Sequence, residues 1–163
     1  MKKIIVALSA IAVIYGCSKS SSSTNTACNY DPCALKAPSA EVLRLKDSIS
    51  YPSNTTQHCS GLLYQIIDTG KGKAATPCSI VNVTYIGRFN DSVYKVHKTF
   101  DSATVSGDLS QVIPGWRDGL PLIKEGGHIL LYIPPSLGYG SQDYLTIPGN
   151  SNLYFDVTLK SVQ

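Results

Sequence analysis

The sequence predicts an α+β domain in which one short helix covers the single apolar face of a twisted antiparallel sheet. From about residue 60 onward, several segments alternate apolar and polar residues, as strands with one buried face do. Trp116, Leu120 and Ile123 lie at i, i+4 and i+7, which predicts a two-turn helix that begins at Pro114-Gly115. A domain of roughly 100 residues can support its own core.

The strands are expected between Gly, Pro and Asn residues that punctuate the chain. The earlier ones are GLLYQIID (61–68), SIVNVTYIG (79–87) and HILLYIPP (128–135). The last, NLYFDVTLK, alternates most clearly and is expected to fray at Ser161. Its predicted buried residues are Leu153, Phe155, Val157 and Leu159. Between the second and third strands, residues 87–111 are expected to be rich in loops.

The N-terminal sixteen residues are predicted to be a secretory signal, because two lysines precede a mostly apolar run. This run is too short to span a bilayer as a lasting helix. Ile14-Tyr15-Gly16-Cys17 is similar to a bacterial lipobox, which implies cleavage before Cys17 and lipid on Cys17. Residues 17–27 then form a Ser-rich tether to a membrane. The serine after Cys17 favours the outer membrane, facing the periplasm.

The charge of the mature chain argues against nucleic acid as a partner. Removing Lys2 and Lys3 from the 14 basic residues leaves 12, against 11 acidic residues. Such a nearly neutral chain lacks the basic surface that binds nucleic acid.

Four cysteines remain after Cys17, and an even number in an exported protein predicts two disulfides. They are Cys28, Cys33, Cys59 and Cys78. Of the three pairings, we favour Cys28 with Cys33 and Cys59 with Cys78. A zinc site is disfavoured because no spacing is C-x-x-C and the histidines fall at no ligand-like interval. No metal or cofactor is therefore expected.

Residues 28–59 are predicted to hold a cysteine-bracketed loop and a short helix, ahead of the main domain at 60–163. Ser39, after Pro38, is the candidate N-cap. Val42, Leu45 and Ile49 share one helical face. Packing of this face on the main domain is favoured, and a dimerising arm is the alternative.

The order of five motifs resembles that of an FKBP-type peptidyl-prolyl cis-trans isomerase over about residues 61–161. The motifs are VNVTYIG, FDSA, QVIPGW, LYIPPSLGYG and IPGNSNLYFDVTL. The resemblance implies about five strands wrapped around a short helix, with an apolar pocket for a prolyl ring. It implies X-Pro segments of exported proteins as substrates, macrolides as inhibitors and no cofactor.

By this resemblance, Trp116 forms the floor of the pocket under the prolyl ring. The aromatic walls are Tyr85, Phe100 and Phe155. Such a pocket fits the reaction, since rotation about an X-Pro bond breaks no bond and needs neither a nucleophile nor a catalytic base. An apolar site that favours the twisted amide is sufficient.

The resemblance also assigns the remaining pocket residues. Val112 and Ile113 form the aliphatic side, and the Ile113 N–H donates to a peptide carbonyl. Tyr139 offers its hydroxyl to a substrate carbonyl, and Ile147 lies in a flap loop. Asp101 accepts a hydrogen bond from the pocket tyrosine and organises the site.

Two departures from the family pattern keep a second function open. The segment after FDSA, TVSGDLSQ, is short, and Val105 stands where several members carry an aromatic wall. A Pro-peptide-binding chaperone with little turnover is therefore one alternative. A structural lipoprotein of an envelope assembly is the other alternative, and the aromatic set argues against it because a pocket without a function would not be expected to keep these rings. The set consists of Tyr85, Phe100, Trp116 and Phe155.

Overall fold

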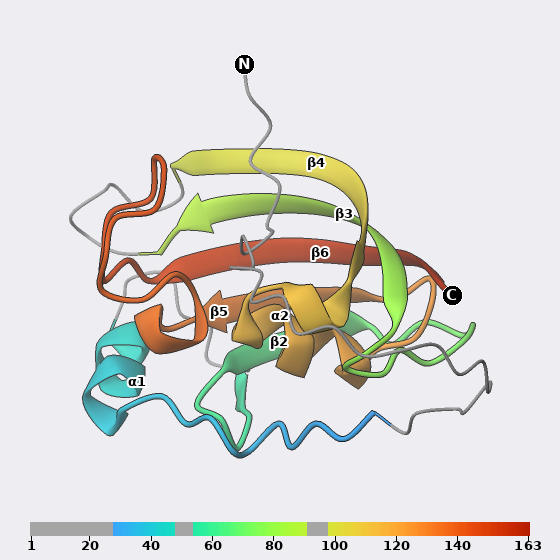
Figure 1. The fold of residues 1–163 in the computed structure, drawn as a ribbon, viewed down its shortest axis with the longest axis horizontal. Helices are drawn as coiled ribbons and strands as arrows, with labels where there is room; N and C mark the ends of the chain where they lie inside the picture. The colour runs from blue at the N-terminus through green and yellow to red at the C-terminus, as the bar shows by residue number, and fades with distance from the viewer. Residues whose placement is uncertain (1–27, 48–53, 91–97) are drawn as a thin grey trace, which may run out of the picture.

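The protein is described here by a computed structural model that covers residues 28–47, 54–90 and 98–163 (Figure 1). The predicted signal peptide, Cys17, the Ser-rich tether and Ile49 lie outside the described residues.

A six-stranded antiparallel sheet curves over one short helix, α2 (Pro114–Gly119), as Figure 1 shows. The strand order is β1-β2-β5-β6-β3-β4. The strands are β1 (Thr56–Gln57), β2 (Leu63–Asp68), β3 (Ile80–Phe89), β4 (Thr99–Asp108), β5 (His128–Ile133) and β6 (Leu153–Val162). This confirms the predicted fold class, with the two-residue β1 added at one edge.

The alternation in the sequence predicts the buried faces of the central strands correctly. Val81, Val83 and Tyr85 of β3 are all buried, and so are the four predicted residues of β6. The predicted fraying at Ser161 is wrong. Ser161 pairs with Asn82, so β6 continues to Val162.

The predicted loop-rich passage at 87–111 is the larger error, because residues 99–108 form strand β4. This strand pairs with β3 from Ile80 to Arg88, with Ala103 opposite Tyr85 and Val105 opposite Val83. Its half-buried residues alternate with exposed ones, but they include Ala103 and Gly107, which are small. Hydrophobic alternation is therefore too weak to reveal this strand, whose existence depends on its long partner.

Helix α2 begins with Pro114 at its first position, where the missing N–H would have had no helical partner. It passes into a 3₁₀ turn, η2 (Leu120–Leu122), because Pro121 cannot donate to the α-helical hydrogen-bond ladder. The predicted stripe is confirmed, since Trp116, Leu120 and Ile123 are all buried.

Two glycines allow α2 to lie very close to β5. Gly115 and Gly119 are four residues apart and so share one face of the helix. A Cβ at Gly115 would lie 2.7 Å from Ile133 Cδ1, and one at Gly119 would lie 2.5 Å from Leu131 Cδ2. A larger side chain at either position would force the helix away from the sheet.

The N-terminal segment crosses the molecule and is fastened by two disulfides. They join Cys28 to Cys78 and Cys33 to Cys59, with Cα–Cα distances of 5.8 and 5.4 Å. The favoured pairing of sequence neighbours is therefore wrong. The reason is the course of the chain: Cys28 reaches the residues that precede β3, whereas Cys33 reaches the turn between β1 and β2.

The same segment contacts the outer side of α2. The Tyr30 hydroxyl donates to Asp118 Oδ1 over 2.7 Å, and the Arg117 guanidinium lies 3.8 Å from the centroid of the Tyr30 ring. Burial raises the pKa of Asp118, and hydrogen bonds from Tyr30 and Ser60 oppose this effect. The cysteine-bracketed loop thus supports the helix that carries Trp116.

Helix α1 (Ser39–Lys46) packs on the sheet face opposite α2, which confirms the favoured prediction for its apolar face. The cluster it completes consists of Val42, Leu45, Leu63, Tyr132 and Tyr154. The predicted N-cap is wrong, because Pro38 occupies that position and no side chain caps the helix. Ser39 is instead the first helical residue, where its hydroxyl cannot act as the cap.

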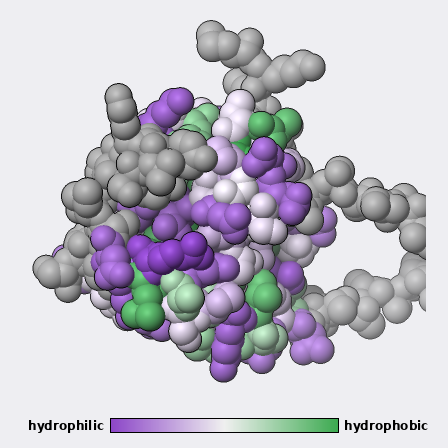
Figure 2. All heavy atoms as spheres, turned by 90° about the vertical axis from the view of Figure 1, so that its left-hand side faces the viewer, coloured by the Kyte–Doolittle hydropathy of each residue, from purple (hydrophilic) through white to green (hydrophobic). Residues whose placement is uncertain are grey.

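Figure 2 looks at the end of the molecule that carries α1, and hydrophobic residues there form small patches among polar ones. Within residues 28–47, 54–90 and 98–163, no helix is long and apolar enough to cross a bilayer.

The close contact between α2 and β5 can be tested by Gly115→Ala. We expect this change to lower the free energy of unfolding by about 1–3 kcal/mol, the usual cost of overpacking a core. Gly107→Ala is the matched control, because a Cβ there meets nothing within 4 Å. Urea denaturation measures both, and equal stability of the two variants would contradict the proposed role of Gly115.

Candidate functional site

Three aromatic rings from three elements meet between α2 and the sheet. Trp116 of α2 lies edge-on to Tyr85 of β3 and to Phe155 of β6, with centroid distances of 5.0 and 5.3 Å. The interplanar angles are 81° and 83°, an arrangement that aromatic pairs favour. The three rings predicted from distant parts of the sequence are therefore brought together.

Phe100, the fourth predicted aromatic residue, lies where β3 and β4 meet. Its ring is edge-on to Phe155 at 5.6 Å and is only partly buried. The ring of Phe100 can lie here because residue 87 is a glycine. A Cβ at Gly87 would lie 2.7 Å from Phe100 Cζ and 2.9 Å from Phe155 Cε1. A glycine inside a strand often marks such a close approach.

Tyr85 and Asp101 are joined by a short hydrogen bond in which the phenol donates to Asp101 Oδ2. The other carboxylate oxygen accepts from the Ser102 N–H at 2.9 Å. Burial, the hydrogen bond to Asp101 and the charge of that carboxylate together raise the pKa of Tyr85. The phenol therefore stays protonated at neutral pH, and the carboxylate fixes its orientation.

The loop that precedes β6 supplies Tyr139 and Ile147. The Tyr139 ring stacks on Tyr144, with centroids 4.7 Å apart. Tyr144 and Ile147 exchange two backbone hydrogen bonds of 2.8 Å, which join the two sides of the flap loop. The Ile147 side chain is buried. Burial raises the pKa of Tyr139, so its hydroxyl remains a donor well above neutral pH.

Val112 and Ile113 lead into α2 and place a backbone donor at its start. Ile113 is the N-cap residue, and its carbonyl accepts from the N–H groups of Trp116 and Arg117. Its own N–H has no hydrogen-bond partner among the described residues. Val112 is partly buried against the main core.

Two side-chain donors of the predicted site are also buried without a partner in the described part of the chain. They are Trp116 Nε1 and the Tyr139 hydroxyl. Because a buried polar group without a hydrogen bond costs about 1–3 kcal/mol, native proteins contain few of them. Both groups could donate to polar groups of a bound ligand, although Arg117 Nε and Asp118 Oδ2 on the outer side of α2 likewise have no partner among the described residues.

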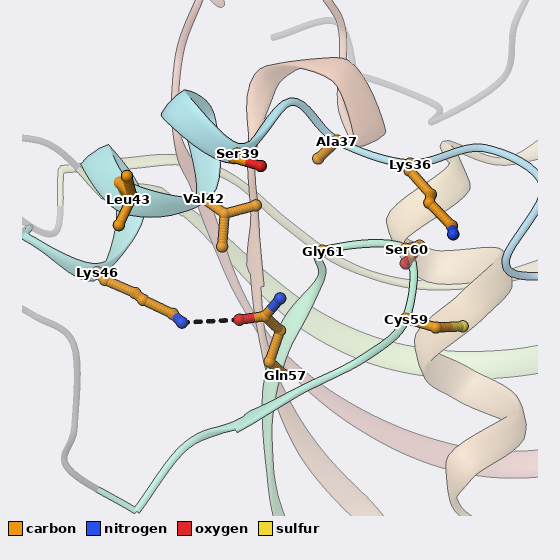
Figure 3. A pocket seen from close by; sticks show the side chains of 10 residues that line it. All are labelled: Lys36, Ala37, Ser39, Val42, Leu43, Lys46, Gln57, Cys59, Ser60 and Gly61. Atoms are coloured by element: carbon orange, nitrogen blue, oxygen red, sulfur yellow. Dashed lines mark hydrogen bonds between the residues drawn. The ribbon is translucent and has the colours of Figure 1, made fainter.

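A cavity of about 260 Å³ opens beside Trp116, between the start of β3, the end of β4 and the segment that enters α2. Val105 and Val112 line it together with the indole. A larger hollow of about 340 Å³ lies between α1 and residues 57–61, where Lys46 Nζ donates to Gln57 Oε1 at 2.7 Å (Figure 3). None of the predicted site residues lines this second hollow.

Two glycines that shape the site, Gly87 and Gly107, are not predicted from the sequence. Gly87 could have been found, because it interrupts an otherwise clear strand pattern. Gly107 could not, because it lies in the strand taken for a loop. Among the described residues, no three His, Cys, Asp or Glu side chains form a group that could hold a metal ion.

Comparison with known proteins gives a family match. The family model for FKBP-type peptidyl-prolyl cis-trans isomerases matches residues 71–160, which is more than half of the chain.

Curated relatives carry the same family description. The chain is 43% identical over 109 residues to the FKBP-type peptidyl-prolyl cis-trans isomerase FkpA of Escherichia coli, covering 64% of this chain and 38% of that protein. It is 43% identical over 114 residues to a probable isomerase of this type from Haemophilus influenzae, covering 66% and 44% respectively. The chain thus matches less than half the length of these relatives.

Solved structures agree in fold. The crystal structure of FkpA from Escherichia coli matches with a TM-score of 0.66 and 37% identity, covering 77% of this chain and 59% of that one. A peptidyl-prolyl cis-trans isomerase from Pseudomonas syringae matches with a TM-score of 0.65 and 26% identity, covering 79% and 98%.

Proposed function

Because the chain belongs to the FKBP-type peptidyl-prolyl cis-trans isomerase family, we propose that it catalyses cis-trans exchange at X-Pro bonds of exported proteins. The observation that carries this proposal is the site itself. The rings of Tyr85, Trp116 and Phe155 meet beside donors that lack partners in the described residues. The same cleft would accept macrolide inhibitors.

The chemistry required is the weakening of amide resonance. This resonance gives a rotation barrier of about 18–20 kcal/mol, and it is lost when the amide twists. An apolar aromatic cleft removes water from the polar planar carbonyl and so favours the twisted form. The prolyl ring would rest against Trp116, held there while the preceding chain turns.

The donors position the peptide. The Ile113 N–H and the Tyr139 hydroxyl would each donate to a substrate carbonyl, and both lack another partner among the described residues. Tyr85, fixed by Asp101, would hold the wall of the cleft in place. Such a site accelerates the reaction by binding the twisted amide more tightly than the planar one.

A chaperone that binds Pro-containing segments with little turnover is the second candidate. Val105 favours it, because this small side chain on the rim leaves an open cavity next to the cleft. A wider cleft would hold a peptide with less restraint on its rotation.

We further propose that lipid on Cys17 anchors the protein to the outer membrane, facing the periplasm. This proposal rests on the lipobox-like sequence and the tether of residues 17–27. Two disulfides in the described domain support an oxidising compartment. Slow exchange at X-Pro bonds, roughly tens to hundreds of seconds uncatalysed, would make an isomerase useful to proteins that fold there.

The isomerase proposal predicts that the full chain, purified in detergent, accelerates exchange in X-Pro peptides. Tyr139→Phe should lower kcat/KM about 10-fold, the effect of one lost hydrogen bond of about 1.4 kcal/mol. Asp101→Asn should also lower kcat/KM, because the carboxylate no longer fixes Tyr85. Exchange spectroscopy by NMR measures the rates directly.

Tyr64→Phe is the matched control, since it removes a hydroxyl from β2, which is distant from β3 and β4 in the strand order. It should leave kcat/KM unchanged. Tight peptide binding without acceleration would contradict the isomerase proposal and support the chaperone proposal.

The anchoring proposal predicts that Cys17→Ala moves the protein from the membrane fraction to the soluble fraction. Ser18→Ala, at the neighbouring position, is the control and should remain with the membrane. Fractionation followed by immunoblotting measures the distribution, and a membrane-bound Cys17→Ala variant would refute lipid anchoring through this residue.

A further inference from the structure

Helix α1 holds a carboxylate against the loop that supplies Tyr139. Glu41 Oε2 accepts a hydrogen bond from the Ser136 N–H over 3.0 Å, although the two residues are 95 positions apart in the sequence. The contact is partly buried, and hydrogen bonds with a charged acceptor are stronger than neutral ones. Glu41 thus joins the N-terminal segment to the loop that follows β5.

The sequence of this loop leaves its first turn without a local cap. Strand β5 ends at Ile133, and a 3₁₀ turn, η3 (Pro135–Leu137), follows with Pro134 at the cap position. Neither proline has an N–H, and Pro134 has no side-chain oxygen that could act as a cap. Ser136 is therefore the first residue after β5 with a backbone donor, and this donor bonds to Glu41 instead of a neighbour in the sequence.

The turn that Glu41 contacts also fixes the backbone on both sides of Tyr139. The Pro135 carbonyl accepts hydrogen bonds from the N–H groups of Gly138 and Gly140, over 3.0 and 2.8 Å. Tyr139 lies between these two glycines, and its hydroxyl is buried without a partner among the described residues. The direction of that hydroxyl therefore depends on the position of η3.

Helix α1 is itself held in place at both ends. Just ahead of the helix, the Ala37 N–H donates to the Ser60 carbonyl over 2.7 Å. At its last residue, Lys46 Nζ donates to Gln57 Oε1 over 2.7 Å (Figure 3). The apolar face between these contacts packs on the sheet. Glu41 therefore extends from a fixed element.

We propose that Glu41 is a positioning residue for the isomerase site, which holds η3 and so directs the Tyr139 hydroxyl toward the substrate. This inference rests on the proposed isomerase function, because Tyr139 is the donor expected to meet a substrate carbonyl. Glu41 lies ahead of residues 71–160, which match the family model. The N-terminal segment would then position a donor of the site in addition to supporting α2.

The first test needs no substrate. Amide hydrogen exchange, measured by NMR on the full chain in detergent, reports on the order of η3. We expect Glu41→Ala to raise exchange at the Gly138 and Gly140 amides about 10-fold, the effect of one lost hydrogen bond. Glu41→Gln keeps an oxygen that can accept from Ser136, so it should restore most of the protection. Unchanged exchange in Glu41→Ala would overturn the proposal.

The second test is a double-mutant cycle with Tyr139→Phe, in which kcat/KM is measured for X-Pro peptides. Glu41→Ala should lower kcat/KM about 5-fold in the wild-type background but less than about 2-fold in Tyr139→Phe, where the hydroxyl it positions is already absent. A purely structural role would lower the free energy of unfolding and leave kcat/KM of the folded protein unchanged. Equal losses in the two backgrounds, or no loss in either, would overturn the proposal.

Asp47→Ala is the matched control, because it removes an exposed carboxylate at the other end of α1. It should leave both kcat/KM and exchange at Gly138 and Gly140 unchanged. Losses as large as those of Glu41→Ala would mean that any change in α1 disturbs the site, which would overturn the specific role of Glu41.

A wild type that accelerates no peptide would contradict the proposed function separately. The cycle would then be taken from dissociation constants of a Pro-containing peptide, read from the fluorescence of Trp116, the one tryptophan of the chain. Additive losses of affinity in this cycle, or unchanged exchange in Glu41→Ala, would overturn the role of Glu41 in that case as well.

Discussion

The close approach of α2 to β5 is the constraint on which the site depends. Gly115 and Gly119 remove the side chains that would hold the helix off the sheet. At this distance the indole that follows Gly115 reaches the rings of Tyr85 and Phe155, and Ile113 is the N-cap residue of the same helix. The proposed chemistry needs no nucleophile or catalytic base, so it depends on how the rings and hydrogen-bond donors are placed.

The N-terminal segment holds the outer side of α2. Tyr30 donates to Asp118, and the segment that carries Tyr30 is fixed at both ends by disulfides to Cys78 and Cys59. A helix of six residues has little stability of its own, since isolated helices of this length do not form in water. The N-terminal segment thus contributes to the site by supporting the helix that carries Trp116.

Sequence reasoning succeeded where one face of an element is strongly apolar. The alternation in β6 and the stripe that begins at Trp116 can be read from the spacing of apolar residues within one short segment. It failed where a segment forms a strand because of its neighbour in the sheet. Strand β4 pairs with the long strand β3, although its own inward residues are small. At Gly107 these small residues leave open space. The pairing of the cysteines was predicted wrongly for the same reason, because the path of the N-terminal segment depends on the whole fold.

In the proposed complex, a prolyl ring binds against Trp116 while the Ile113 N–H donates to the peptide. Intermolecular nuclear Overhauser effects between a Pro-containing peptide and the isotope-labelled protein test this claim most directly. We expect contacts from the prolyl ring protons to the indole of Trp116, with a downfield shift of the Ile113 amide. Prolyl contacts confined to other surfaces, such as the hollow beneath α1, with no change at Trp116, would contradict it.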